Sequence, residues 1–325
     1  MDLKTDYLGL ELRSPVVIGS SGLTLSLNNI KKFENFGAGA VVLKSLFEEQ
    51  IMYETHNSLE SYDTYQHPEA MDFLKYITRE QSIDKYLTLI NNAKKSVSVP
   101  VIASINCISN NKWTEFTGKL ENAGADALEL NMFITDYGKL NSTQIEDLYF
   151  KIIENVKRNT KLPIAIKVSY FFTNLPQMLL KLAYSGVSGM VLFNRYYSPD
   201  IDIEKKEVTS GSFFSSPDDV NVPLRWIGIL AGNVSCDISA TTGIHTAREA
   251  VKLFMAGAKT VQLCSTLYKN GIDYLKTFLQ DLKSWLKKHN YNNINEIRGL
   301  LTSKSTEEQK LFSRTQYMKY YSNLE

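Results

Sequence analysis

Cysteine and histidine are scarce in this 325-residue sequence, which holds three cysteines and four histidines. No two cysteines form a CxxC pair, and three are too few for a disulfide framework, so we expect a reducing cytoplasm as the compartment. The spacing around His67 and His245 supplies no further ligands. We therefore predict no metal site and expect both histidines to serve turns or caps.

A charge bias and long apolar runs are missing as well. The 36 basic and 35 acidic residues leave a formal net charge of +1. They are spread along the chain, which gives no polyanion-binding patch and argues against nucleic acid as a partner. No apolar run approaches the roughly 20 residues that span a bilayer, and the N-terminus lacks a basic region followed by an apolar one. We expect a soluble, cytoplasmic protein without a membrane partner.

Short apolar segments alternate with segments of helical period along most of the chain. The apolar segments predict eight strands, at residues 15–20, 37–45, 99–106, 127–131, 163–169, 189–194, 236–241 and 260–265. The periodic segments predict helices at residues 25–36, 82–97, 112–122, 142–157, 175–184, 245–255 and 270–289, with Ser142 as an N-cap. This order favours a single (β/α)8 TIM barrel over residues 1–325, and an open doubly wound sheet is the competing architecture.

Three stretches do not fit the alternation cleanly. Residues 46–79 have no steady period, and their aromatic content favours an ordered lid over one face. Residues 195–222 alternate between Ile201 and Val208, which predicts an inserted hairpin, and continue into a loop. Residues 223–234 begin with a proline suited to a helix start but are apolar enough for a strand, so both alternatives stay open.

Polar residues stand at or just past the ends of the predicted strands, where the active sites of barrels are built. They are Ser20, Lys44, Asn106, Asn131, Lys167, Asn194 and Ser265. A serine or asparagine in such a place often only caps a turn. Lys44 and Lys167, however, each close an otherwise apolar strand, and we predict that they converge across the barrel mouth.

The last two strand-to-helix turns carry a second signal. The segment ATTGIHTAREA places Gly243 in a hydroxyl-rich turn ahead of a helix, and Ser265 and Thr266 follow the next strand. Backbone N–H groups at such turns bind anions, and barrels often hold phosphate after their seventh and eighth strands. A simple turn and cap is the alternative, but we predict the phosphate of a cofactor here.

A set of short motifs occurs in a fixed order over nearly the whole chain. The motifs are SSG at 20–22, LKS at 43–45, ELN at 129–131, IKV at 166–168, FN at 193–194, TTG at 241–243, AGAKTVQLCSTLYKNG at 256–271 and INEIRGLL at 294–301. Together they resemble the dihydroorotate dehydrogenase family, specifically its soluble class 1 members. The resemblance implies an FMN-binding barrel, usually a homodimer, that oxidises dihydroorotate to orotate in pyrimidine biosynthesis by hydride transfer to the flavin.

The resemblance also implies roles for individual residues. The cofactor-binding residues would be Ser20, Ser21 and Gly22 facing the flavin, Lys44 and Ser45 beside its pyrimidine ring, Asn106 and Lys167 at its polar atoms, Asn131 beside the flavin and the substrate, and Thr242, Gly243, Cys264 and Ser265 around the phosphate. A cation near N1 of the flavin would stabilise its reduced, anionic form. Lys44, Asn131 and Asn194 would act on a small acidic substrate.

The sequence departs from the family at the catalytic base. Members carry a Ser-Cys-Pro-Asn segment after the ELN strand, and the Cys removes the substrate proton. The matching residues here are Phe133, Ile134, Thr135 and Asp136. Isoleucine cannot accept a proton, so Thr135 or Asp136 would have to act, and only if the loop shifts. Asp136 has the better chemistry because it is ionised at neutral pH, but it would equally suit a solvated loop.

Other departures lie on the substrate side. The family's Asn-Ser-Met-Gly-Leu-Pro-Asn segment is replaced by residues within 65–69, and its glycine-rich flavin segment is replaced by residues 213–218. Arg195 stands where the family has a small Ser. A cation there would favour an acidic substrate, although it could equally pair with Asp200 or Asp202.

Two classes of function are consistent with these observations. One is an FMN-dependent oxidoreductase acting on a CH–CH bond, with dihydroorotate or a related acid as substrate and the usual base replaced. The other is a non-catalytic relative that binds a phosphate ligand or a partner protein through the retained barrel. The sequence leaves the electron acceptor open, and it predicts a surface helix or tail at residues 310–325.

Overall fold

Parallel strands form a closed barrel in the computed structural model, which describes residues 1–56, 82–110, 112–134, 138–195, 199–303 and 318. In order around the ring the strands are β3 Val16–Ile18, β4 Ala40–Val42, β6 Val101–Cys107, β7 Ala127–Met132, β8 Ile164–Val168, β9 Gly189–Leu192, β12 Asp237–Thr241 and β13 Thr260–Leu263. Pairing of β13 with β3 and of β4 with β6 closes the ring. The predicted (β/α)8 barrel is confirmed, and the open sheet is wrong.

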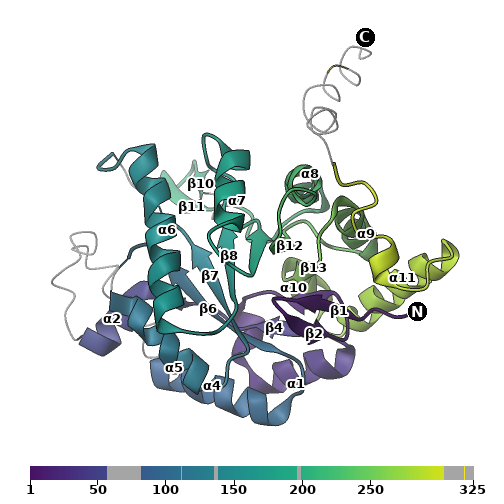
Figure 1. The fold of residues 1–325 in the computed structure, drawn as a ribbon, viewed down its shortest axis with the longest axis horizontal. Coiled ribbons are helices and arrows are strands. Elements are labelled where there is room, and N and C mark those ends of the chain that lie inside the picture. The colour runs from purple at the N-terminus through teal and green to yellow at the C-terminus, as the bar shows by residue number, and fades with distance from the viewer. Residues whose placement is uncertain (57–81, 111, 135–137, 196–198, 304–317, 319–325) are drawn as a thin grey trace.

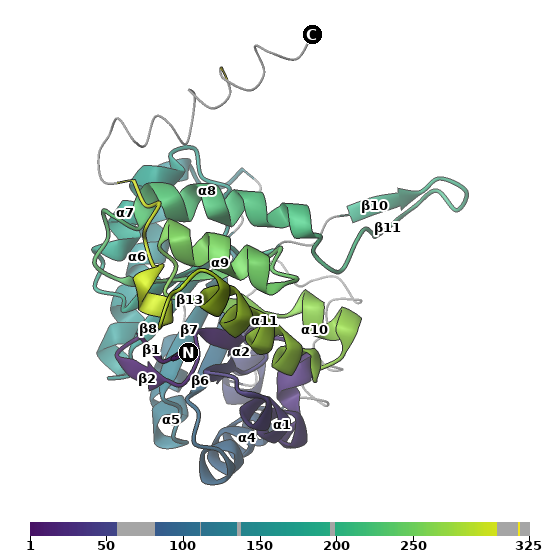
Figure 2. The ribbon, with the colours of Figure 1, turned by 90° about the vertical axis from the view of Figure 1, so that its right-hand side faces the viewer.

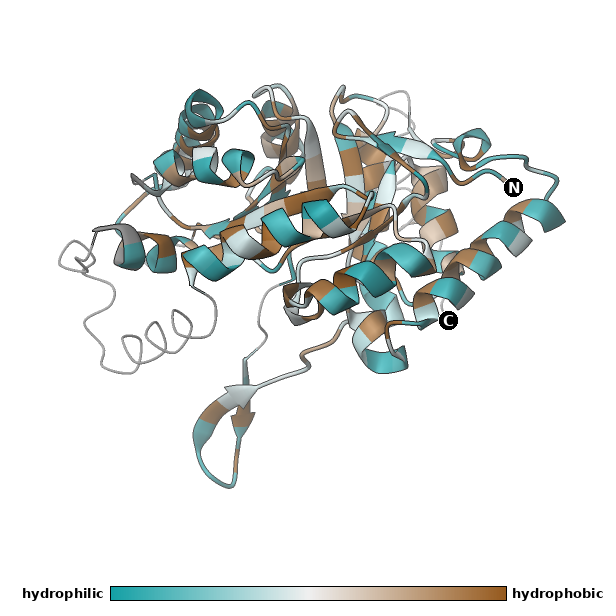
Figure 3. Cartoon of the chain, turned by 90° about the horizontal axis from the view of Figure 1, so that it is seen from below, coloured by the Kyte–Doolittle hydropathy of each residue, from teal (hydrophilic) through white to brown (hydrophobic). Residues whose placement is uncertain are grey.

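Helices cover the outside of this barrel (Figure 1). They are α1 Leu27–Phe36, α2 Glu48–His56, α4 Ile83–Ser96, α5 Thr117–Asn122, α6 Ser142–Asn159, α7 Leu175–Ala183, α8 Asn221–Leu230, α9 Ala247–Ala256, α10 Ser265–Asn270 and α11 Tyr274–Lys288. Short 3₁₀ turns are η1 Gly22–Leu25, η3 Lys112–Phe116, η4 Pro217–Val220 and η5 Ile294–Glu296. Hydrophilic and hydrophobic residues alternate along the outer helices (Figure 3). Helix α11, for example, buries Leu275, Phe278, Leu279, Leu282 and Leu286.

Several details correct the sequence predictions. The stretch 46–79 begins with strand β5 Leu46–Phe47, which pairs with β6, and helix α2 follows. The rest of the stretch lies outside the described residues. Asn141, not Ser142, caps α6, because its side chain accepts from the Gln144 N–H at 2.9 Å. The predicted helix 112–122 starts as η3, and Gly271 (φ 87°) separates α10 from α11. Residues 223–230 lie in α8, so the helix alternative for the stretch 223–234 is confirmed and the strand is wrong.

A hairpin that was not predicted from the sequence closes the N-terminal end of the barrel. Its strands are β1 Thr5–Tyr7 and β2 Leu10–Leu12. Tyr7, Leu8 and Leu12 pack on the inward-facing residues of the barrel: Val17, Ala40, Val42, Ile102, Ala127, Ala165 and Val191. This end is therefore filled with apolar side chains, and any ligand must enter from the opposite end.

The predicted inserted hairpin exists and leaves the body of the molecule (Figure 2). Strands β10 Pro199–Asp202 and β11 Glu207–Ser210 pair in antiparallel register, with Ile201 opposite Val208. Both side chains are exposed, as expected for a hairpin with no sheet beneath it. Among the described residues, no helix is both long enough and apolar enough to cross a membrane.

Candidate functional site

Side chains alternate between the outer helices and the barrel interior along each strand. On β7, Leu128 and Leu130 pack under the helices, whereas Ala127 packs in the inner cluster. Glu129 and Asn131, at even spacing from Ala127, therefore face inward. Strand register then aligns Asn106, Asn131 and Lys167 on β6, β7 and β8 in one inward row.

This inward row opens into a cavity of about 220 Å³ at the C-terminal end of the barrel. Predicted site residues that line the cavity are Ser20, Asn131, Lys167, Asn194, Thr242, Gly243, Cys264 and Ser265. The Asn194 side chain comes from the loop after β9 and donates a hydrogen bond to the side-chain oxygen Oδ1 of Asn131. Ser21, Gly22, Lys44, Ser45 and Asn106 lie at neighbouring positions but do not line it. The cavity thus contains Lys167 without Lys44.

A chain of serine hydroxyls fixes the neighbouring strand ends. Ser45 donates its backbone N–H to the Ser20 hydroxyl at 3.0 Å, and its own hydroxyl lies 2.8 Å from that of Ser104. Ser104 is fully buried, and its N–H donates to the Tyr86 hydroxyl at 2.9 Å. Half-buried Lys44 precedes Ser45, so this network holds its backbone in place.

Two polar residues that sequence reasoning missed lie at and beneath the cavity: Gln262 lines it, and Glu129 is buried behind that lining. Glu129 is 1% exposed and accepts a hydrogen bond at 2.7 Å from the Gln262 side chain. The Lys167 ammonium lies 3.8 Å from the other Glu129 oxygen. The available signal was the spacing of two between Glu129 and Asn131, which places both on the inward face of β7.

The turn after β12 has an unusual backbone. Thr242 and Gly243 both adopt positive φ, 78° and 77°. A Cβ on Gly243 would lie 2.1 Å from the Val220 nitrogen, so only glycine permits this contact with η4. The Thr242 hydroxyl donates to the Phe193 carbonyl at 3.2 Å and holds the turn against the end of β9. The predicted phosphate turn is thus a rigid part of the cavity wall.

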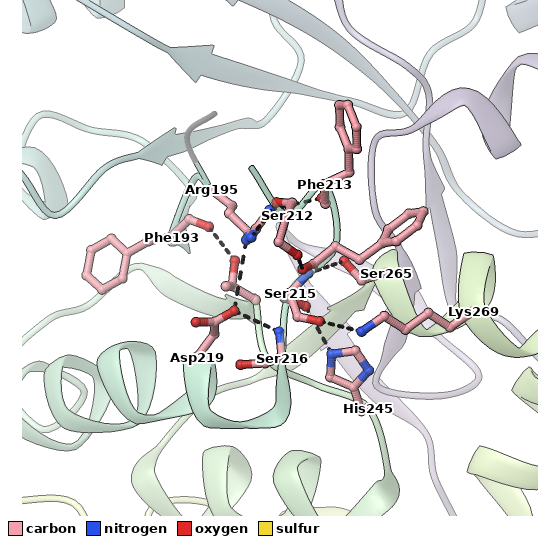
Figure 4. A network of polar contacts seen from close by, with 12 residues as sticks. Phe193, Arg195, Ser212, Phe213, Ser215, Ser216, Asp219, His245, Ser265 and Lys269 are labelled. Carbon is pink, nitrogen blue, oxygen red and sulfur yellow. Dashed lines mark hydrogen bonds and ion pairs between the residues drawn. The ribbon is translucent and has the colours of Figure 1, made fainter. Parts of the chain in front are cut away.

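Residues 212–216 cross the same end of the cavity (Figure 4). The Ser215 N–H donates to the Ser265 hydroxyl at 3.1 Å, and the Lys269 ammonium donates to the Ser215 carbonyl at 2.8 Å. The Ser215 hydroxyl lies 3.1 Å from His245 Nε2. Burial, followed by the nearby Lys269 charge, lowers the pKa of His245, which favours a neutral imidazole at neutral pH. Side chains thus anchor the segment that replaces the glycine-rich one.

Arg195 contacts this segment from the other side. Its guanidinium donates to the carbonyls of Ser212 and Phe213, each at 2.9 Å, and lies 3.9 Å from the Asp219 carboxylate on η4 (Figure 4). The alternative pairing with Asp200 or Asp202 is wrong, because the guanidinium contacts these two carbonyls and Asp219 instead. Arg195 has carbonyl and carboxylate partners of its own, so its charge is largely engaged before any substrate arrives.

Ile134, which stands where the resemblance places the catalytic base, also has apolar surroundings in the structure. Ile134 is partly buried and packs against the core. Thr135 and Asp136 lie outside the described residues, as do residues 65–69 and almost all of the tail 310–325. Burial raises the pKa of the Cys264 thiol, although the nearby Lys167 charge acts to lower it. Burial also raises the pKa of the Cys107 thiol well above its ordinary value. Both thiols stay protonated at neutral pH, so neither takes over as a base.

Comparison with known proteins supports the family resemblance of the sequence motifs. The family model described as dihydroorotate dehydrogenase matches residues 2–286. The catalytic subunits of dihydroorotate dehydrogenase B (NAD(+)) from Methanocaldococcus jannaschii and Thermoplasma volcanium are 26% and 25% identical; each match covers 92% of this chain, and 97% and 98% of the relative.

A plant enzyme extends this similarity to a second kind of dehydrogenase. The chloroplastic dihydropyrimidine dehydrogenase (NADP(+)) of Arabidopsis thaliana is 22% identical, over 92% of this chain and 76% of the relative. The family model alone spans well over half of the sequence. The chain belongs to the dihydroorotate dehydrogenase family.

Proposed function

We propose that the chain is an FMN-dependent oxidoreductase that acts on the CH–CH bond of a small acidic dihydropyrimidine, dihydroorotate or a close relative. One observation carries the proposal: Lys167, Asn131 and Asn194 line one cavity at the C-terminal end of the barrel. Membership of the family supports the same activity, and the names of the relatives favour a dihydropyrimidine ring.

The residues around the cavity fit a flavin. The pyrimidine part of a flavin offers both N–H donors and carbonyl acceptors, and the cavity supplies an ammonium on Lys167 and side-chain amides on Asn131, Asn194 and Gln262. The buried Gln262 Oε1 has no hydrogen-bond partner among the described residues, which suits a ligand N–H.

The family resemblance supplies the remaining cofactor contacts of this proposal. Ser20, Ser21 and Gly22 would lie beside the flavin rings, with Lys44, Ser45 and Asn106 next to them, and Thr242, Gly243, Cys264 and Ser265 would surround the phosphate. The tight turn at Gly243 brings backbone close to that end of the cavity. When bound, FMN supplies the hydride acceptor. The chain's own residues bind and orient both molecules and exclude water.

The paired asparagines give the substrate side a defined polarity. Asn194 donates to Asn131 Oδ1, which leaves the Asn131 NH2 group as a donor and the Asn194 side-chain carbonyl as an acceptor. An imide edge of a dihydropyrimidine presents the complementary acceptor and donor. We assign the proton-accepting role to Asp136 ahead of Thr135, because a carboxylate needs no activation at neutral pH.

An anaerobic titration tests this function. Purified protein reconstituted with FMN should lose its flavin absorbance when dihydroorotate is added, and Asp136→Asn should slow that loss while leaving FMN bound. Flavin that stays oxidised with dihydroorotate and with dihydrouracil would remove this substrate class. The resemblance also implies a cytoplasmic homodimer. Light scattering of the purified protein would test the oligomeric state.

A further inference from the structure

A buried polar pair, Glu129 and Gln262, lies at the base of the cavity, and only Gln262 lines it. The Gln262 amide donates to Glu129 Oε2 at 2.7 Å. Strands β7 and β13 lie opposite each other in the closed ring, so this hydrogen bond crosses the barrel interior. Gln262 lines the cavity, whereas Glu129 is only 1% exposed. A carboxylate is thus held directly beneath the space that a ligand would fill.

Lys167 stands above this carboxylate as its counter-charge. The distance from Lys167 Nζ to Glu129 Oε1 is 3.8 Å, within ion-pair range but longer than a hydrogen bond. An ammonium has three N–H donors. Glu129 therefore attracts the ammonium from below by charge, while the N–H groups of Lys167 remain available to a ligand in the cavity.

Two oxygen atoms of this polar pair, Glu129 Oε1 and Gln262 Oε1, are buried and lack hydrogen-bond partners among the described residues. A buried carboxylate is costly unless it is paired, so Glu129 depends on Lys167. The two opposite charges also balance, which leaves the base of the cavity close to neutral instead of cationic.

We infer that Glu129 is a positioning residue, which holds the Lys167 ammonium at the base of the cavity and, by balancing its charge, keeps the reduction potential of a bound flavin low. The flavin part of this inference rests on the proposed function; the pairing part does not. A reduced flavin gains negative charge, which an unbalanced Lys167 would stabilise more strongly. Removing the Glu129 charge should therefore raise the potential.

The pairing is tested on the purified chain without added ligand by a double-mutant cycle in chemical denaturation. Lys167→Met leaves Glu129 buried and unpaired, so it should destabilise the wild-type protein strongly. It should destabilise far less in the Glu129→Gln background, where no charge is stranded. Equal destabilisation in the two backgrounds would overturn the pairing, whether or not the protein binds flavin.

The charge effect is tested by measuring the potential of bound FMN. Glu129→Gln should favour the reduced flavin by about tenfold, or about 30 mV for a two-electron couple. Glu129→Asp keeps the charge and should restore a potential near that of the wild type, which a purely structural role would not do. An unchanged potential in Glu129→Gln, with coupling intact, would overturn the electrostatic role. Failure of the wild type to bind FMN would instead overturn the proposed function.

Discussion

The same strands form an apolar, filled end of the barrel and a polar end with a cavity. At the N-terminal end, Tyr7, Leu8 and Leu12 fill the interior against small and β-branched side chains. At the C-terminal end, the inward positions carry Lys167, Asn131 and Gln262, whose polar atoms line a cavity. Apolar packing at one end supplies stability, and the other end accepts unsatisfied groups that a ligand can use. Substitutions at the two ends should therefore separate stability from ligand binding.

The largest expected effect is at the closed end. Leu12→Ala removes a side chain that is 2% exposed and should lower the free energy of unfolding by ~2–5 kcal/mol. FMN affinity of the folded variant should stay unchanged. Chemical denaturation and FMN titration check both parts. Leu300→Ala, at a side chain that is 53% exposed, is the matched control and should cost under ~0.5 kcal/mol. Weak FMN binding by Leu12→Ala would break the separation.

The opposite pattern is expected at the open end. Asn131→Ala removes a cavity-lining amide that bonds Asn194, so turnover should fall by ~10²-fold, as for loss of one oriented donor. Unfolding free energy should change by only ~1 kcal/mol, because one hydrogen bond is lost. Steady-state kinetics measures the change in turnover, and chemical denaturation measures the change in unfolding free energy. Full activity in this variant would contradict the placement of the substrate.

Two glycines with the same backbone conformation sharpen the comparison. Gly243 at the open end has φ 77° and Gly9 at the closed end has φ 76°. A Cβ would clash with the Val220 backbone at Gly243 but meets nothing within 4 Å at Gly9. Gly9→Ala should cost ~1 kcal/mol from backbone strain alone. Gly243→Ala should cost more than Gly9→Ala and also weaken FMN binding. Equal unfolding midpoints and equal FMN affinities for the two variants would argue against a built phosphate turn.

The smallest effect concerns the polar contacts that fasten the closed end. Asp237 accepts the Leu8 N–H and the Lys259 ammonium, each at 2.8 Å, and Lys259 also bonds Asp6. The hydrogen bond from Lys259 lowers the pKa of Asp6 below 3.8, so its stabilisation is present above that pH and is lost as the pH falls through the lowered value.

Asp6→Asn tests this contact. The Asp6 side chain is 58% exposed, so the substitution should cost under ~1 kcal/mol at pH 7. The difference from the wild type should shrink as acidification protonates Asp6, which denaturation at several pH values would show. A difference that grows on acidification would contradict this sign.

The barrel itself could be predicted because its strands are short apolar runs with clear helical segments between them. Other elements gave no such signal. Helix α2 buries Glu48 and Gln50, so its pattern does not follow the rule that apolar residues face inward. The closing hairpin has strands of three residues each and a turn with positive φ at Leu8 and Gly9, too short for any period to emerge.

Polar residues at strand ends predicted part of the candidate site, although Lys44 and Asn106 do not line the cavity. Lys167, Asn131 and Asn194 gather in one cavity as barrel geometry implies. Glu129 and Gln262 sit within strands and were overlooked, although their neighbours already fixed their inward direction. The partners of Arg195 depend on how residues 212–219 return from the hairpin, which local sequence does not encode.

The measurement that tests the central claim most directly is titration of the purified chain with FMN, followed by quenching of flavin fluorescence. The open end of the barrel should bind one FMN per chain, with affinity weakened in Gly243→Ala and retained in Leu12→Ala. If the wild type leaves FMN fluorescence unchanged, or if Leu12→Ala and Gly243→Ala bind equally well, the polar end of this barrel is not a flavin site.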